Sequence, residues 1–272
     1  MDNIDITHNN IENEQKILLK NILEYLVKLK KYGQPDAQVK EQLLKYIKEH
    51  LNLDIATVFK LADGYKQQDN CPPEHSYLLG YLNNYGLGTF IDTTLAFKLY
   101  EKTALAGVPY GQARLGYCYD KRIGTLQNFN EAFCWYKLAA EQNNLAAQCL
   151  LASYYGNGYG TNKDLEKSVY WYTRAAEAGQ PNAQYALARR YMQGVGVERN
   201  QRRGFLWFKI YSITHQLGNA YSYFDYAKCF KDGLGTMKDV HECLRVYRRA
   251  FLANEKERVM DHCSRLFKIG KE

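Results

Sequence analysis

The chain has 272 residues, of which 46% are hydrophobic and 24% charged, the balance of a folded protein and not of a disordered one. No apolar run approaches the roughly 18 residues that a membrane-spanning helix needs, and the N-terminus lacks the basic start and apolar stretch of a signal peptide. The formal net charge is +7, and residues 183–272 carry the excess, with 17 basic and 9 acidic side chains. Seven cysteines, none in a C-x-x-C pair, are typical of a reduced, cytoplasmic protein.

The first 70 residues predict a helical segment after a polar start. Residues 1–11 are expected to be disordered. In residues 12–70, apolar side chains recur at three- and four-residue spacing in two stretches, and a third helix is expected at about 54–66. The first two apolar faces consist of Leu18, Ile22, Tyr25, Leu26 and Leu29, and of Val39, Leu43, Ile47 and Leu51. We interpret residues 12–70 as a helical cap on the remainder of the chain, or as an independent interaction segment.

From residue 75 onward the sequence repeats with a period near 36. Five similar residue pairs, which we call anchors, mark the repeats. Counted from the first residue of each anchor, a glycine stands nine positions later and a small residue seventeen positions later. A bulky pair such as Trp171-Tyr172 comes next. The anchors are Leu79-Gly80, Leu115-Gly116, Leu151-Ala152, Leu187-Ala188 and Tyr226-Ala227. Self-similarity at a fixed period of this length predicts stacked structural repeats.

Each repeat has the pattern of two helices joined by a glycine turn. In the third copy, the first helix (helix A) ends at Gly156-Asn157-Gly158-Tyr159-Gly160, because glycine tolerates the left-handed backbone of a helix C-terminus. The second helix (helix B) is expected from about Asp164 to Ala178. The small residue lets the two helices approach closely, and the bulky pair fills the space between hairpins. One hairpin cannot bury its apolar face alone, so neighbours must stack into an all-α solenoid.

The pattern A-x-x-L-G-x-x-Y-x-x-G-x-G, followed by a small residue, W-Y and A-A-E-x-G, resembles the Sel-one-like repeat (SLR) family, a branch of the tetratricopeptide-like α-solenoids. Residues 147–179 match it nearly throughout, including Ala175-Ala176-Glu177. The resemblance implies a right-handed α-solenoid of about five SLR hairpins over residues 75–254, with residues 255–272 as a C-terminal capping helix. Where cysteine-rich relatives carry disulfides, this chain has residues such as Gln148 and Ala176, which favours a reducing compartment.

Two departures from the family pattern are expected to alter the structure locally. Arg122 replaces the first turn glycine, so a side chain must adopt a positive φ at a cost of ~1 kcal/mol, or the turn must differ. The longer spacing between the last two anchors inserts residues around Ser212 to Asn219. This insertion predicts a longer helix B, or a wider loop, in the fourth repeat.

Residues that could carry chemistry form no catalytic motif. The nearest cluster of possible zinc ligands has no zinc-site spacing, and it consists of Cys229, His241, Cys243, His262 and Cys263. No Ser-x-x-Lys tetrad occurs, and His241-Glu242 lacks the second histidine of H-E-x-x-H. We therefore predict no enzymatic activity, no metal site, no cofactor and no small-molecule substrate.

Helix A lines the concave face of solenoids of this family, and such faces bind partners. By analogy with tetratricopeptide geometry, the predicted partner-binding residues are Tyr77, Tyr81, Tyr117, Lys121, Tyr185, Arg189, Gln193 and Lys228. This groove is aromatic toward its N-terminal end and basic toward its C-terminal end. It suits a protein or peptide that carries apolar anchors and acidic residues. The alternative is that these tyrosines are scattered surface residues.

The favoured function is a non-enzymatic adaptor or scaffold for a protein or peptide partner, and the family resemblance implies roles such as signalling or a regulatory subunit. The alternative is RNA binding through the basic C-terminal third, with rings stacked on bases and arginines on phosphates. We rank it second, because the arginine clusters sit beside helix-packing residues and no RNA-reading motif occurs.

Overall fold

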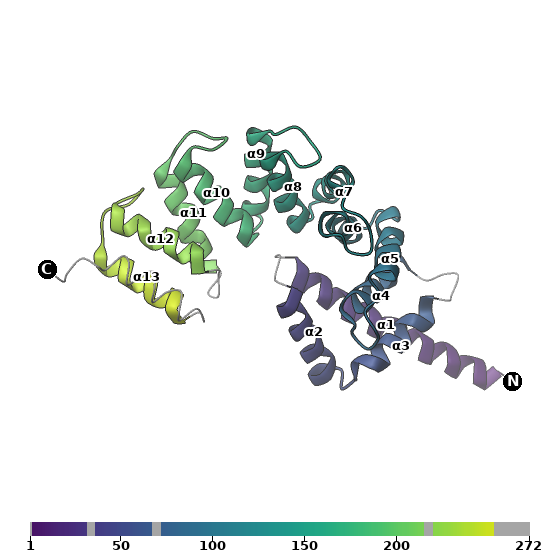
Figure 1. Ribbon diagram of the computed structural model, residues 1–272. Coiled ribbons are helices and arrows are strands. Elements are labelled where there is room, and N and C mark those ends of the chain that lie inside the picture. Colours follow the sequence, from purple (N-terminus) through teal and green to yellow (C-terminus); the bar gives the residue numbers. More distant parts are fainter. Residues whose placement is uncertain (1, 32–35, 67–71, 215–219, 253–272) are drawn as a thin grey trace. The chain divides into compact units, whose positions relative to one another are not determined.

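The computed structural model describes residues 2–31, 36–66, 72–214 and 220–252 (Figure 1). Within these ranges it contains thirteen helices and no strands, which confirms the predicted all-α fold. The chain divides into two compact units, Met1–Lys163 and Asp164–Glu272, so that the boundary falls inside the third repeat. The predicted C-terminal helix at 255–272 lies outside the described residues.

The helices follow the repeat pattern closely in both units. The first unit contains α1 (Asp2–Lys30), α2 (Asp36–His50), α3 (Ile55–Lys66), α4 (Pro73–Tyr85), α5 (Thr93–Leu105), α6 (Pro109–Lys121), α7 (Phe129–Glu141) and α8 (Leu145–Asn157). The second contains α9 (Leu165–Glu177), α10 (Pro181–Gln193), α11 (Gln201–Thr214), α12 (Ala220–Asp232) and α13 (Val240–Leu252). Helix A of each repeat is therefore α4, α6, α8, α10 or α12. Helix α11 has 14 residues where α5, α7, α9 and α13 have 13, in line with the longer fourth repeat.

Among the described residues, no helix combines the length and the apolar character that crossing a membrane requires.

The start of the chain differs from the sequence prediction. Helix α1 begins at Asp2, where residues 1–11 were expected to be disordered. Extending an existing helix adds one backbone hydrogen bond per residue without a new nucleation cost. The polar composition of this segment therefore did not prevent helix formation.

The three N-terminal helices share one apolar core with the first repeat. Leu26 of α1, Leu43 of α2 and Val58 of α3 are fully buried in the same cluster as Leu78 and Leu82 of α4. Helices α1 and α3 both contact α4. The N-terminal helices therefore pack on the first hairpin.

Helix α3 takes the place that helix B of a preceding repeat would occupy. Asp54 caps its N-terminus by accepting a hydrogen bond from the Thr57 backbone N–H at 2.8 Å. A Cβ built on Gly88, in the first glycine turn, would lie 2.6 Å from the Ile55 carbonyl oxygen in the first turn of α3. In the later repeats, the glycine at the same position contacts the first turn of helix B of the preceding repeat in the same way.

A side-chain cap begins every helix B. Each cap accepts a hydrogen bond from the backbone N–H three residues further on, at 2.8–3.2 Å, in the preferred N-cap geometry. The capping residues are Asp92, Asn128, Asp164, Asn200 and Asp239. They recur in phase with the repeat, so the signal for these caps lies in the sequence, although the sequence prediction missed it.

Buried glutamines link successive hairpins within each unit. The Gln148 Nε2 donates to the Ala140 carbonyl at 3.1 Å in the first unit, and the Gln184 Nε2 donates to the Ala176 carbonyl at 3.2 Å in the second. Both side chains are 2% exposed, so each bond satisfies a helix-end carbonyl that water cannot reach. Polar bonds therefore connect helix B to the next helix A.

The residue that follows each helix A has a left-handed backbone, as predicted. In the second repeat this residue is Arg122, where the other four repeats have glycine. Its φ is 60°, beside values of 62–78° at the four equivalent glycines. The Arg122 guanidinium is exposed and donates one long hydrogen bond, 3.3 Å, to Gln127. The turn therefore keeps the family geometry.

We expect Arg122→Gly to stabilise the first unit. Relief of about 1–2 kcal/mol of left-handed strain is partly offset by the larger backbone entropy that glycine loses on folding, so the net gain is up to about 1 kcal/mol, or roughly 2–4 °C in melting temperature. Asn143→Gly is the matched control, since Asn143 has a φ of 61° and asparagine tolerates this conformation better than arginine does. Thermal unfolding followed by circular dichroism measures both; a melting temperature that is unchanged or lower in Arg122→Gly would mean that the turn is not strained.

Candidate peptide-binding surface

The predicted partner-binding residues fall into two groups, one in each unit. Tyr77 and Tyr81 of α4 and Tyr117 and Lys121 of α6 belong to the first unit, and we call this group the N-terminal patch. Tyr185, Arg189 and Gln193 of α10 and Lys228 of α12 belong to the second unit and form the C-terminal patch. The two patches have very different surroundings.

Tyr77 and Tyr81 do not line an open surface, contrary to expectation. They are 3% and 0% exposed, because the N-terminal helices pack over α4. The ring of Tyr77 lies edge-on to Tyr110 with centroids 4.7 Å apart, and the ring of Tyr81 lies 4.6 Å from that of Tyr85. Tyr117 is half-buried, and Lys121 is exposed beside the Asp120 carboxylate at 3.1 Å.

A buried arginine, which the sequence prediction missed, is the centre of the N-terminal patch. Arg114 of α6 is 6% exposed. Its guanidinium lies 4.9 Å from the ring centroid of Tyr117, 5.4 Å from Tyr100 and 5.5 Å from Tyr85, within the range of cation–π attraction. Its Nη2 donates to the Tyr85 hydroxyl at 2.7 Å. The sequence contains one sign that Arg114 is unusual. It stands one residue before the anchor Leu115, and at this position the first and third repeats have Leu78 and Leu150.

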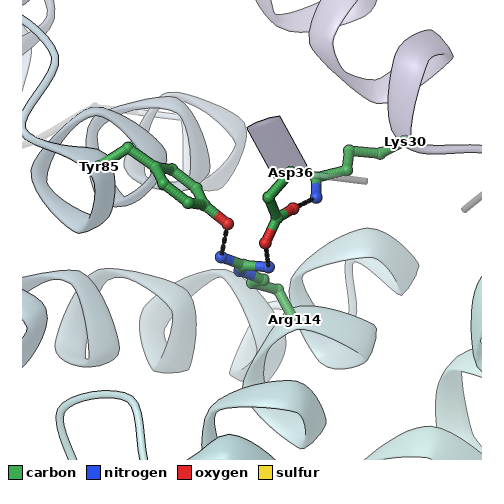
Figure 2. Close-up of polar contacts among 4 residues, drawn as sticks. All are labelled: Lys30, Asp36, Tyr85 and Arg114. Carbon is green, nitrogen blue, oxygen red and sulfur yellow. Dashed lines mark hydrogen bonds and ion pairs between the residues drawn. The ribbon is translucent and has the colours of Figure 1, made fainter. Parts of the chain in front are cut away.

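Figure 2 shows how the N-terminal helices reach this arginine. The Asp36 carboxylate, at the start of α2, lies 3.8 Å from the Arg114 Nη1 and also contacts the Lys30 ammonium at the end of α1. Burial, with a smaller contribution from Arg114, lowers the pKa of Lys30 to about 7. Two basic side chains therefore face one carboxylate in a largely desolvated site.

The C-terminal patch is open to solvent. The Tyr185 hydroxyl donates to the Asp225 carboxylate at 2.7 Å, and the Arg189 Nε lies 4.0 Å from the same oxygen. The side chains of Arg189 and Asp225 are 52% and 40% exposed. Burial and the Asp225 carboxylate raise the pKa of Tyr185, so that its hydroxyl remains a hydrogen-bond donor. Gln193 and Lys228 are exposed.

The described residues contain no group of three or more His, Cys, Asp and Glu side chains that could hold a metal ion. Cys229 and Cys243 are buried in an apolar cluster of the second unit, and His262 and Cys263 lie outside the described residues. Burial raises the pKa of Cys118 to about 11 and that of Cys229 to about 12. The thiolate is the reactive form of cysteine, so these two thiols are poor nucleophiles at neutral pH.

Cys134, by contrast, is exposed. We expect iodoacetamide at pH 8 to modify Cys134 at least about tenfold faster than Cys118 or Cys229 in the native protein. Peptide mapping by mass spectrometry gives the three rates, and unfolding in guanidinium should make them similar. Equal rates in the native protein would show that the two buried thiols are accessible.

Comparison with known proteins supports the repeat assignment. The sequence pattern of the Sel1 repeat matches residues 76–108, 109–144, 145–180, 181–210 and 220–254. A search among curated proteins found no match. The chain is similar to a Sel1 repeat protein from Oxalobacter formigenes, with a TM-score of 0.69 and 26% identity over 77% of this chain and 84% of that one.

It is also similar in fold to c5321, a protective antigen of uropathogenic Escherichia coli with an SLR fold. The TM-score is 0.71 at 24% identity, over 92% of this chain and 53% of the antigen, so the chain spans about half of that protein. Five matched repeats, the left-handed turns that end helix A and the close-packed hairpins agree with one another. The chain belongs to the Sel1 repeat family.

Proposed function

We propose that this protein is a non-enzymatic adaptor that binds an acidic segment of a protein partner on its C-terminal patch, within a cytoplasmic signalling or regulatory complex. The Sel1 repeat is generally a protein-interaction fold. The observation that supports this choice most is that the C-terminal patch, while exposed, already holds one carboxylate of its own chain between Tyr185 and Arg189.

An incoming carboxylate can replace Asp225 beside Arg189 at small cost. Exposed ion pairs contribute only about 0–1 kcal/mol, and Arg189 lies at the long limit of ion-pair distance from Asp225. The guanidinium of Arg189 presents several N–H groups in a planar fork, which allows two parallel hydrogen bonds to a better-placed carboxylate. Lys228, at the equivalent position of the next helix A, adds a second exposed cation.

Apolar anchoring is available beside these charges. Tyr185 of α10 and Phe224 of α12 are half-buried and pack against the apolar core of the second unit. Their rings are therefore held in place, and each offers apolar surface next to Asp225, which follows Phe224 in the chain. Rigid aromatic residues beside charged ones are typical of binding hot spots. The patch suits a peptide in which an apolar side chain accompanies an acidic one.

A second candidate function is RNA binding, and one observation favours it. Helix α11 exposes Arg202, Arg203 and Lys209 and contains no acidic residue between Gln201 and Thr214. Such a helix attracts phosphates without recognising sequence. The C-terminal patch, however, combines its cations with a carboxylate and a tyrosine hydroxyl that donates to it, which favours a protein ligand.

The two candidates differ in their response to salt. A peptide is first selected from a displayed library on the wild-type protein and then synthesised with a fluorophore, and a generic single-stranded RNA is labelled in the same way. Anisotropy titrations at 50 and 200 mM salt compare them. We expect the peptide to bind at both concentrations, with a modest loss, and the RNA not to bind. Tighter binding of the RNA, with a loss of about 10³-fold or more between the two salts, would replace the proposal with the second candidate.

A further inference from the structure

We infer that Arg114 is the centre of a second carboxylate-binding site and that Asp36, from the N-terminal helices, occupies this site in place of an acidic group of a partner. The inference deepens the proposed function, since it assigns a second site to the same class of ligand. It stands on contacts in the first unit alone.

The Arg114 site has the features of a binding site and not only those of a packed core. The Nε of Arg114 is buried without a hydrogen-bond partner, and so are the hydroxyl oxygens of Tyr81 and Tyr100. Buried polar groups in folded proteins are nearly always paired, with protein or with a bound molecule. The ring of Tyr100 lies 5.4 Å from the Arg114 guanidinium, so an unpaired N–H donor and an unpaired hydroxyl belong to one cluster, where a polar ligand group can bind.

Asp36 satisfies this arginine only in part. Its carboxylate approaches one nitrogen, Nη1, at 3.8 Å, which is too long for a hydrogen bond. A guanidinium that is 6% exposed forms its strongest contacts with a carboxylate held by two parallel hydrogen bonds. The Asp36 side chain is 30% exposed, so it sits at the rim of the site. A carboxylate on a longer or freer chain, such as a glutamate side chain or a peptide C-terminus, can approach more closely.

The charge of the site also favours exchange with an external anion. Lys30 and Arg114 carry two positive charges if both are protonated, and Asp36 supplies one negative charge (Figure 2). Burial disfavours the charged form of Lys30, as its lowered pKa shows. If the first turn of α2 moves away, Lys30 and Arg114 are left facing each other, and a ligand carboxylate relieves that repulsion.

The C-terminal patch shows the same combination of groups in an open form. In the C-terminal patch, Arg189 and Tyr185 contact Asp225. In the first unit, Arg114 contacts Tyr85 and Asp36. Arg189 and Arg114 both lie on a helix A. The difference is that the carboxylate at Arg114 comes from the N-terminal helices, which also bury Tyr77 and Tyr81. The N-terminal helices thus act as an internal ligand as well as a cap, and a partner's acidic segment competes with them.

The test is made on the full chain with three small probes. N-acetyl-Glu-Glu-amide carries side-chain carboxylates only, N-acetyl-Gln-Gln carries a C-terminal carboxylate only, and N-acetyl-Gln-Gln-amide is neutral. Every variant also carries Arg189→Glu and Lys228→Glu, so that the C-terminal patch cannot contribute to binding. Affinities are measured by NMR titration of the backbone amide signals, and in every variant that keeps Arg114 its Nε–H signal also reports on the site directly.

We expect Asp36→Asn to bind at least one of the charged probes at least tenfold more tightly than the protein with Asp36 does, and not to bind the neutral probe. The stronger charged probe identifies the source of the carboxylate. Adding Arg114→Met to Asp36→Asn should abolish binding. If circular dichroism shows that this variant is unfolded, Lys30→Met replaces it and should weaken binding at least threefold. Glu41→Gln, an exposed charge on the same helix, is the matched control and should leave affinity unchanged.

A purely structural ion network predicts a different result. In that case Asp36→Asn lowers stability but binds the charged probes no better than the protein with Asp36 does, and this outcome would overturn the inference. Binding that survives Arg114→Met, or that the neutral probe shares, would overturn it as well. Because the C-terminal patch is already disabled in these variants, none of these outcomes bears on the proposed function.

Discussion

Replacing Gly124 with alanine should lower the free energy of unfolding of the first unit by about 2–5 kcal/mol. The φ of Gly124 is 67°, so a side chain there costs about 1–2 kcal/mol in backbone strain alone. A Cβ would also overlap the Thr93 carbonyl oxygen and lie 2.7 Å from its carbon and 2.8 Å from the Phe97 Cβ. Helix α5 begins at Thr93, so the loop of the second hairpin must withdraw from the first, at a further cost of about 1–3 kcal/mol.

Gly107 provides the matched control for this change. Its φ is 81°, also in the left-handed region, but a Cβ there would meet nothing within 4 Å. Gly107→Ala should therefore cost only the strain, about 1–2 kcal/mol. Native-state hydrogen exchange of α4 to α7 measures the stability of both variants. Equal losses in the two variants would show that the contact between the turn and the preceding helix is not what the repeat glycine preserves.

Leu26→Ala should destabilise the first unit by about 2–5 kcal/mol, the usual cost of truncating a large buried side chain. Leu26 is fully buried in the core that α1 shares with α2, α3 and α4. Because this core holds the N-terminal helices on the first repeat, we expect the loss to appear in the exchange of α4 amides as well as in α1.

Ile17→Ala, also in α1, is the control for this prediction. Ile17 is 58% exposed, and its truncation should change stability by less than about 0.5 kcal/mol. Hydrogen exchange followed by mass spectrometry resolves the two helices. If Leu26→Ala increases exchange in α1 and leaves α4 protected, the N-terminal helices are an independent element and not a cap.

The sequence alone was sufficient for the parts of the fold that depend on local chemistry. A period near 36, the turn glycines and the small residues specify the hairpins, since each acts through its own backbone or its nearest neighbours. Arg122 is an instructive case: the repeat phase predicted a positive φ at a residue that disfavours it, and the structure has 60°. The side-chain caps at Asp92 and its equivalents could have been predicted in the same way, because they recur in phase with the repeat.

The candidate site was less predictable, because it depends on contacts between residues far apart in the chain. Tyr77 and Tyr81 were assigned to an open groove from the geometry of a single repeat, and packing of the N-terminal helices buries them. Arg114 stands where the repeat pattern expects an apolar side chain, and its role is visible only once Asp36 and Tyr85 are brought beside it. No rule based on repeat phase relates these positions.

The central claim is that an acidic partner binds the helix-A surface of the second unit, and a pair of charge reversals tests it most directly. Arg189→Glu with Lys228→Glu changes this surface. Lys209→Glu with Arg248→Glu makes the same change in charge at exposed positions of the B helices α11 and α13. Circular dichroism should show that both variants keep their helices. We predict that the first pair weakens binding of the selected peptide at least about 100-fold, as the loss of two charge-assisted contacts implies, and that the second pair changes it less than about threefold. Equal losses from the two pairs, or undiminished affinity in the first, would contradict the account.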